Sequence, residues 1–198
     1  AVIALMALAL VLVWRSTRMV NFAQVGQAMF TTYIALTVQQ STGNWVLALI
    51  VALLAGSILG VVVFFLVIRP VKNSDTTGAI IATFGVLIAL QAGAGMIWGG
   101  DPEGFVPPVD NSGLEIGGRI WPVSPYDLLV LVVTAVLVIG LTLLFTKTSL
   151  GLSMRASAFN PEVARLSGVR VNRMLITGWV IAGATGAIGG VLIAPFST

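Results

Sequence analysis

Side chains able to carry out acid–base, nucleophilic or metal chemistry are scarce in this sequence. It has no histidine and no cysteine, which removes imidazole bases, thiol nucleophiles and the common zinc-binding sets. No G-x-S-x-G, H-E-x-x-H or phosphate-binding G-x-x-x-x-G-K motif is present, and the apolar segments hold no pair of carboxylates. We therefore expect no catalytic residue, no bound metal and no cofactor.

Uncharged polar side chains, in contrast, recur inside apolar segments. In "RMVNFAQVGQAMFTTYIA" they fall roughly on one stripe of a helix, and in "ATFGVLIALQAGAGMIW" two of them are eight residues apart, on one face two turns away from each other. An amide or hydroxyl within lipid needs a polar partner, so these residues either bond neighbouring helices together or line a path for a small polar solute. The candidate lining residues are Asn21, Gln24, Gln27, Thr31, Thr83 and Gln91.

A second candidate site is the basic segment 147–173, which carries five of the ten lysines and arginines. Within it, Asn160 is a favoured helix N-cap, Pro161 suits the first helical position, Glu162 complements the positive helix end, and Gly168 suits a left-handed stop. These start and stop signals predict a two-turn helix over 161–167. We expect an amphipathic helix before it, with Leu150, Met154 and Ala158 on one side.

A two-turn helix is too short to be stable alone in water and must be held by packing. Its apolar residues Val163 and Leu166 therefore need a cover. Two interpretations remain open on the residues alone: the helix lies on its own bundle or in the lipid headgroups, or it docks into a groove of a cytoplasmic partner.

The elements that must position these residues are transmembrane helices. The chain of 198 residues is 58% hydrophobic and only 9% charged, well outside the composition of soluble domains. Apolar segments long enough to span a bilayer, the first of them incomplete, occur near 1–14, 20–38, 45–68, 78–98, 126–145 and 174–196. We predict one all-α membrane domain over 1–198, with about six transmembrane helices.

The basic residues fix the expected orientation of these helices. Alternate threading puts nine of the ten lysines and arginines on one side of the membrane and leaves only Arg119 on the other, which makes the basic side, including segment 147–173, cytoplasmic. Here the charge sets topology, and we expect no nucleic-acid binding. The spans hold no charged residue in their middle, which argues against proton-driven transport.

Three further features of the chain complete this picture. Small residues recur every fourth position in the last span, at Gly178, Ala182, Gly186 and Gly190, which predicts close helix packing. The external segment 99–124 is either a solvated loop or carries a short β-hairpin at "LEIGGRI" that covers the mouth of the bundle. The abrupt apolar start and end suggest that the chain is part of a longer protein, and the start is interpreted as the remainder of a span and not a signal peptide.

The segment "TSLGLSMRASAFNPEVARLSGVRVNRMLITGWVIAGATGAIGGVLIAP" closely resembles the permease subunits of branched-chain amino acid ATP-binding-cassette importers. In these permeases a pattern similar to G-x-x-x-R-A-x-x-x-N-P-x-x-A-x-x-x-G precedes a Gly/Ala-rich helix. The segments "MVNFAQVGQAMF", "LQAGAGMIWGGDPEGF" and "LEIGGRIWPVSPYDLLVLVV" extend the likeness through nearly the whole chain, which looks like the H-type subunit. Gln24 and Val25 depart from the family's usual His-Gly.

The resemblance implies a partnership in the bacterial inner membrane. A second permease subunit would complete the pathway, two ATP-binding subunits would bind the cytoplasmic loops and hydrolyse ATP, and a periplasmic or extracellular binding protein would deliver the solute. The short helix would then be the coupling helix, with Asn160, Pro161, Glu162, Ala164, Arg165 and Gly168 as its working residues. Alternatives are an ion-coupled carrier or channel, and an importer of urea or short-chain amides.

Overall fold

The protein is an all-α membrane protein. The computed structural model describes residues 7, 11, 21–71, 76–99, 104–109, 112–113, 115–116, 119–120 and 123–196. Apart from residues 7 and 11, the predicted first span over 1–14 lies outside these ranges, as do Arg15, Arg18 and Lys72, so the expected count of six spans is not confirmed.

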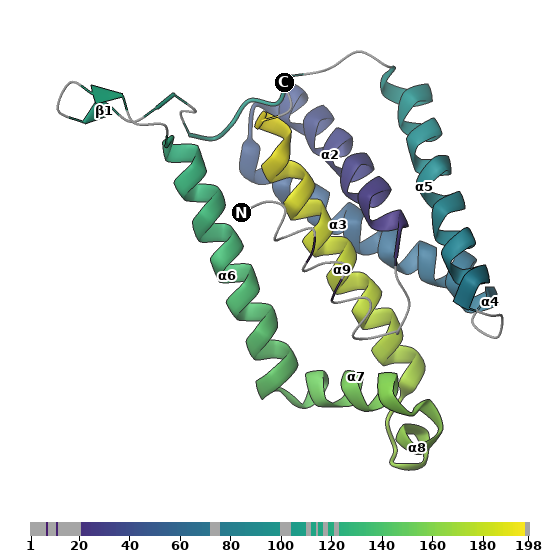
Figure 1. Cartoon of the computed structure of the whole chain (residues 1–198). Helices are drawn as coiled ribbons and strands as arrows, with labels where there is room; N and C mark the ends of the chain where they lie inside the picture. Colours follow the sequence, from purple (N-terminus) through teal and green to yellow (C-terminus); the bar gives the residue numbers. More distant parts are fainter. Residues whose placement is uncertain are drawn as a thin grey trace.

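Five long helices form the described part of the chain (Figure 1). They are α2 (Ala23–Thr42), α3 (Trp45–Val63), α5 (Thr76–Trp98), α6 (Pro125–Lys147) and α9 (Val171–Ile193). Four stretches are long and apolar enough to cross a membrane: Trp45–Ile68, Gly78–Trp98, Pro125–Lys147 and Val171–Phe196. These four match predicted spans. The helix α2 is not among them, because the polar residues of its stripe lower its mean hydropathy.

Local capping explains where these helices begin and end. Gly43 ends α2 with a φ of 66°, a left-handed conformation that glycine adopts without steric cost. Asn44 then begins α3, its side chain accepting a hydrogen bond from the Leu47 amide at 3.1 Å. At the start of α6, Ser124 and Asp127 form a reciprocal capping box, which satisfies backbone donors that a helix start leaves unpaired.

The helix α3 changes its hydrogen-bond pattern before it ends. It continues as a π-helical turn, η1 (Phe64–Ile68), into the short α4 (Arg69–Val71). The Arg69 amide donates to the carbonyl of Phe64, five residues back, which is the π-helical pattern. The span therefore carries one wide turn at its basic end.

Close backbone packing joins α3 and α2 to α9. A Cβ atom placed on Gly56 or Gly60 of α3 would collide with the backbone of Gly183 or Trp179 of α9. A Cβ atom placed on Gly190 of α9 would likewise collide with Ala28 and Thr32 of α2. Interfaces of small residues let transmembrane helices approach this closely, so α9 is the central helix of the described bundle (Figure 1).

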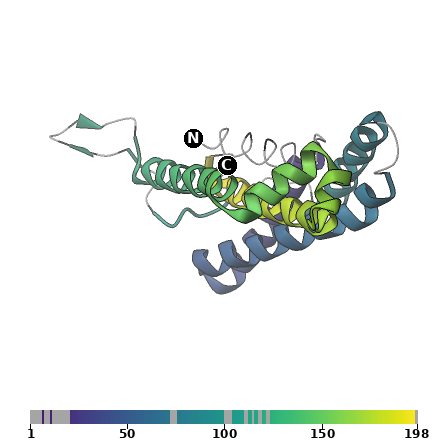
Figure 2. The ribbon, with the colours of Figure 1, turned by 90° about the horizontal axis from the view of Figure 1, so that it is seen from below.

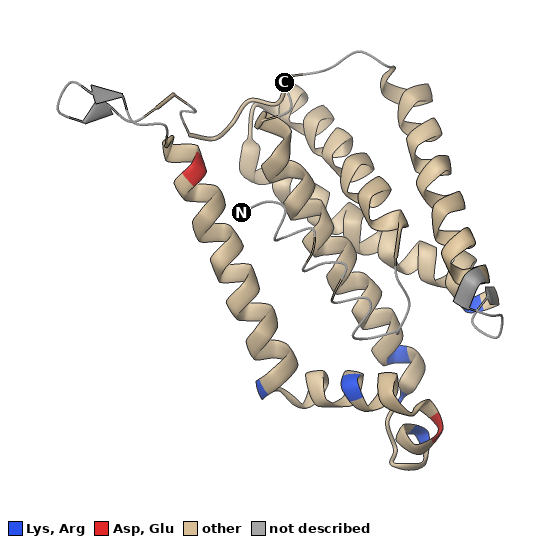
Figure 3. Cartoon of the chain, viewed as in Figure 1, with Lys and Arg blue, Asp and Glu red and all other residues tan. Residues whose placement is uncertain are grey.

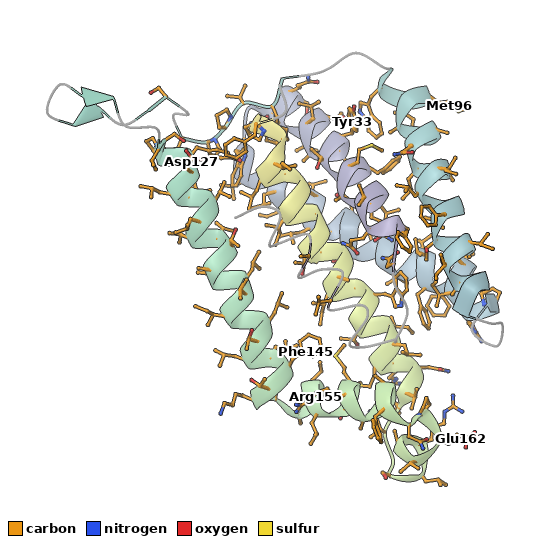
Figure 4. The ribbon with its side chains drawn as sticks, in the orientation of Figure 1. Tyr33, Met96, Asp127, Phe145, Arg155 and Glu162 are labelled. Atoms are coloured by element: carbon orange, nitrogen blue, oxygen red, sulfur yellow. The ribbon has the colours of Figure 1, made fainter. Side chains whose placement is uncertain are left out.

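The helix α6 stands away from α9 in Figure 1, and α7 connects its inner end to the inner end of α9. At the outer end, the Tyr126 hydroxyl donates to the carbonyl of Leu192 at 3.0 Å. At the inner end, Phe145 of α6 packs with Met154 of α7 (Ser149–Phe159). The labelled Phe145 lies directly above α7 in Figure 4.

Two short strands lie between α5 and α6. Strand β1 (Glu115–Ile116) pairs antiparallel with β2 (Arg119–Ile120), Glu115 facing Ile120 and Ile116 facing Arg119. The pair extends sideways beyond the start of α6 and does not lie over the helices (Figures 1 and 2). The predicted position over the mouth of the bundle is therefore wrong for this conformation.

Charged residues gather at one end of the bundle (Figure 3). Asp127, labelled in Figure 4, lies at the opposite end of α6. The basic end carries Arg69, Lys147, Arg155, Arg165, Arg170 and Arg173. This separation by the apolar helices agrees with the orientation derived from the positive-inside rule.

Candidate functional site

The short helix in the basic segment is α8 (Pro161–Leu166), and its boundaries follow from its caps. The Asn160 Oδ1 atom accepts hydrogen bonds from the amides of Glu162 and Val163, both at 3.1 Å. Pro161 occupies the first helical position, where its missing amide donor is not needed. At the other end Gly168 has a φ of 82°, so the chain turns back as predicted from the glycine.

A single small side chain anchors α8 to the bundle. Ala164 is 4% exposed and belongs to a packed cluster that also contains Phe64 and Ile68 of the π-helical turn and Leu175 and Trp179 of α9. A helix of six residues has little stability of its own. The packing of Ala164 in this cluster therefore determines where α8 is held.

The larger apolar side chains around α8 point away from the bundle. Val163 is 55% exposed, Leu166 is 89% exposed, and Phe159, just before the cap, is 85% exposed. Val163 and Leu166 are three residues apart and so lie on the same side of the helix. We call these three residues the docking face; more than half of each side chain is left exposed by the described residues of the chain.

Charged side chains flank the docking face. Glu162 and Arg165 of α8 and Arg155 of α7 are all exposed, and Figure 4 shows Arg155 and Glu162 at the basic end of the molecule. Apolar residues with a charged rim are typical of protein interfaces. The same pattern also suits lipid headgroups, so the geometry limits α8 to these two kinds of contact.

The polar stripe on α2 is buried, as amides within a membrane protein must be. Asn21, Gln24, Gln27 and Thr31 are each 1% exposed or less. The Asn21 Nδ2 atom donates to Gln24 Oε1 at 3.2 Å, and Gln24 Nε2 donates to the carbonyl of Ala182 in α9 at 2.9 Å. Gly186 of α9 leaves the space that the Gln24 amide occupies.

Gln27 differs from Gln24 although both are buried on the same helix. Among the described residues, neither its Nε2 nor its Oε1 atom has a hydrogen-bond partner. Thr31 donates to the backbone carbonyl of Gln27, at 2.8 Å, and not to its side chain. A buried polar group without a partner costs about 1–3 kcal/mol. Within the described stripe, the Gln24 amide is thus satisfied, Asn21 lacks a partner for Oδ1 alone, and Gln27 lacks a partner for both polar atoms.

The two polar residues of α5 do not share one environment. Thr83 is buried and donates to the carbonyl of Ile80 at 2.9 Å, whereas Gln91 is exposed. Eight residues make about 2.2 turns, so the second residue is rotated by about 80° around the helix. That rotation carries Gln91 out of the buried face, and the prediction of a common face is too coarse here.

The small residues of α9 have distinct neighbours. Gly178, Ala182, Gly186 and Gly190 are all buried, and Ala182 contributes its carbonyl to Gln24. The sequence pattern missed Gly183, which packs against Gly56. It also missed Phe159 of the docking face, although an apolar residue directly before a helix cap is a usable signal.

The sequence can now be compared with known proteins. The profile of a family described as "Branched-chain amino acid transport system / permease component" matches residues 1–198. The chain belongs to this family. The four apolar helices found in the described part of the chain fit a multi-pass membrane protein. No solved structure matches the chain.

Curated relatives carry the same description. A probable branched-chain amino acid transport permease protein, LivH of Methanocaldococcus jannaschii, is 32% identical over 97% of this chain and 62% of its own length. The high-affinity permease proteins LivH of Salmonella typhimurium and BraD of Pseudomonas aeruginosa are 26% and 27% identical over 98% and 96% of this chain, and over 66% of their own lengths. The chain thus spans about two thirds of the length of these relatives.

Proposed function

We propose that this chain is a permease subunit of an ATP-driven importer of branched-chain amino acids in the cytoplasmic membrane. The observation that carries the proposal is the uncovered docking face on α8, at the basic end of a membrane bundle. The proposal has ATP hydrolysed on partner chains, while this chain conducts the solute and transmits movement.

In the proposed assembly, two ATP-binding subunits engage the cytoplasmic end and a second permease subunit completes the pathway. A binding protein delivers the solute from outside. The residues proposed to couple the two activities are those that form α8: Asn160 and Gly168 fix its ends, Pro161 starts it, Ala164 anchors it, and Glu162 and Arg165 flank the docking face. A groove in the ATP-binding subunit would cover Val163 and Leu166.

The solute class rests on the relatives. LivH and BraD are described as branched-chain amino acid permeases, and their likeness extends along nearly the whole chain. A nucleoside permease protein, NupB of Lactococcus lactis, is 32% identical over 42% of this chain, which makes nucleosides the second candidate solute. Urea and short-chain amides are further competitors to include in any uptake experiment.

Uptake by the reconstituted complex tests the proposal. The full-length protein, its second permease subunit and its ATP-binding subunits are placed in liposomes with the binding protein outside. We expect leucine uptake that requires ATP inside the liposomes and is competed by isoleucine and valine. Uptake driven by an ion gradient without ATP would instead show a secondary carrier.

A further inference from the structure

We propose that Gln27 is the residue of the polar stripe that contacts the transported solute, through both Nε2 and Oε1 of its side chain. The solute class that this contact selects carries an N–H donor and a carbonyl or carboxylate oxygen and has no net charge. The inference rests on the proposed permease function and separates a pathway residue from the residues that hold helices together.

The first step is that Gln24 and Thr31 already use their side chains within the bundle, and Asn21 donates to Gln24 although its Oδ1 atom has no partner among the described residues. Gln24 bridges α2 to α9 through the carbonyl of Ala182 at 2.9 Å and also accepts from Asn21. Thr31 donates to carbonyls of its own helix, at 2.8 and 2.9 Å. A hydrogen bond between helices is what polar residues contribute to membrane packing, and Gln24 supplies it for this stripe.

The second step is that packing does not account for Gln27. Its side chain is 1% exposed, yet both of its polar atoms lack a partner among the residues that the structure describes. Buried side-chain amides are normally hydrogen-bonded, and an exception calls for a reason such as function or an absent ligand. A partner that arrives with the solute, in a conformation that admits it, provides that reason.

The third step is the direction in which Gln27 leaves α2. Its preceding neighbour Gly26 packs against Leu87 of α5, and its following neighbour Ala28 packs against Gly190 of α9. Successive residues of a helix point about 100° apart, so Gln27 leaves the helix between these two contacts.

The fourth step is the chemistry of the free amide. A glutamine side chain offers two N–H donors and one oxygen acceptor, and it is complementary to an α-amino acid, an amide or urea. In the described spans, charged side chains lie only near the helix ends, at Asp127, Lys147 and Arg173. A site built on an uncharged amide binds a polar solute without requiring it to carry net charge.

Two matched variants of the full-length protein test the inference, Gln27→Leu and Gln24→Leu. Each is purified with its partner subunits and its melting temperature is measured, followed by uptake of leucine, acetamide and urea in liposomes. For Gln27→Leu we expect a melting temperature equal to or above that of the unmodified protein, because an unsatisfied amide is removed. Uptake of the transported solute should fall at least tenfold.

The control variant should behave in the opposite way. Gln24→Leu loses the bond to Ala182 and should lower the melting temperature, with uptake falling in proportion to the folded protein that remains. A Gln27→Asn variant keeps the amide on a shorter side chain, and it should retain more uptake than Gln27→Leu and raise the KM for the solute.

Three outcomes would overturn the inference. One is a Gln27→Leu protein that melts as low as Gln24→Leu, because Gln27 would then hold helices together. The second is a Gln27→Leu protein that transports normally. In the third, the unmodified complex fails to take up any of the three solutes with ATP, which would remove the proposed function itself and this inference with it. Only the first two leave the permease proposal standing.

Discussion

Gly56 of α3 and Gly183 of α9 face each other backbone to backbone, and a Cβ atom on either residue would collide with the carbonyl group of the other. This contact lies between the two helices that form the centre of the described bundle. Neither residue needs a special φ angle for its role; each is required because the partner helix is so close.

Gly183→Ala should therefore destabilise the protein, by about 1–3 kcal/mol, as expected for overpacking. The matched control is Gly140→Ala in α6, where a Cβ atom would meet nothing within 4 Å. That control should be neutral or stabilising, by up to about 1 kcal/mol, because alanine is the better helix former. Thermal unfolding in detergent measures both, and equal melting temperatures would contradict the close contact.

Removing the cap of α8 should loosen the helix without affecting the bundle. Asn160→Ala deletes the acceptor of two backbone amides, a loss of about 0.5–2 kcal/mol. Hydrogen exchange at residues 161–168 should become faster, while exchange in α9 stays the same. Asn172→Ala, an exposed residue of the first turn of α9, is the control, and unchanged exchange in α8 would show that the Asn160 cap is not needed.

Polar substitution on the docking face should weaken binding of the ATP-binding subunits. Leu166→Ser changes a side chain that is 89% exposed, so folding should be preserved while affinity falls at least tenfold, a change of about 1.4 kcal/mol. The comparison is Leu152→Ser, an exposed position on α7 at the same end. If both variants bind equally well but associate less with lipid, α8 lies in the headgroups instead.

Removing one hydroxyl should loosen the outer attachment of α6. Tyr126→Phe keeps the ring but deletes the hydrogen bond to Leu192, which should cost about 1 kcal/mol in the free energy of unfolding. Tyr33→Phe is the matched change on α2, where the ring stacks on Trp98 and is retained. A larger loss from Tyr33→Phe than from Tyr126→Phe would contradict this assignment.

Local chemistry made much of the fold predictable. The bounds of α8 follow from Asn160, Pro161 and Gly168, because caps and a left-handed turn act within a few residues. The membrane spans follow from apolar length. The change from α-helical to π-helical hydrogen bonds at Phe64, directly after α3, was not predicted. Nothing in an apolar run distinguishes a π-helical turn from an α-helical one.

From its amino-acid order, the chain is expected to place Gln24 and Gln27 as polar residues within one apolar helix, each in need of a partner. How the helices pack makes the two residues different. Gln24 donates to the carbonyl of Ala182, 158 residues away, beside the space left by Gly186, whereas the Gln27 amide has no partner in the described part of the chain. The partner of a buried amide is set by which distant backbone packs beside it, and that depends on how helices remote in sequence cross.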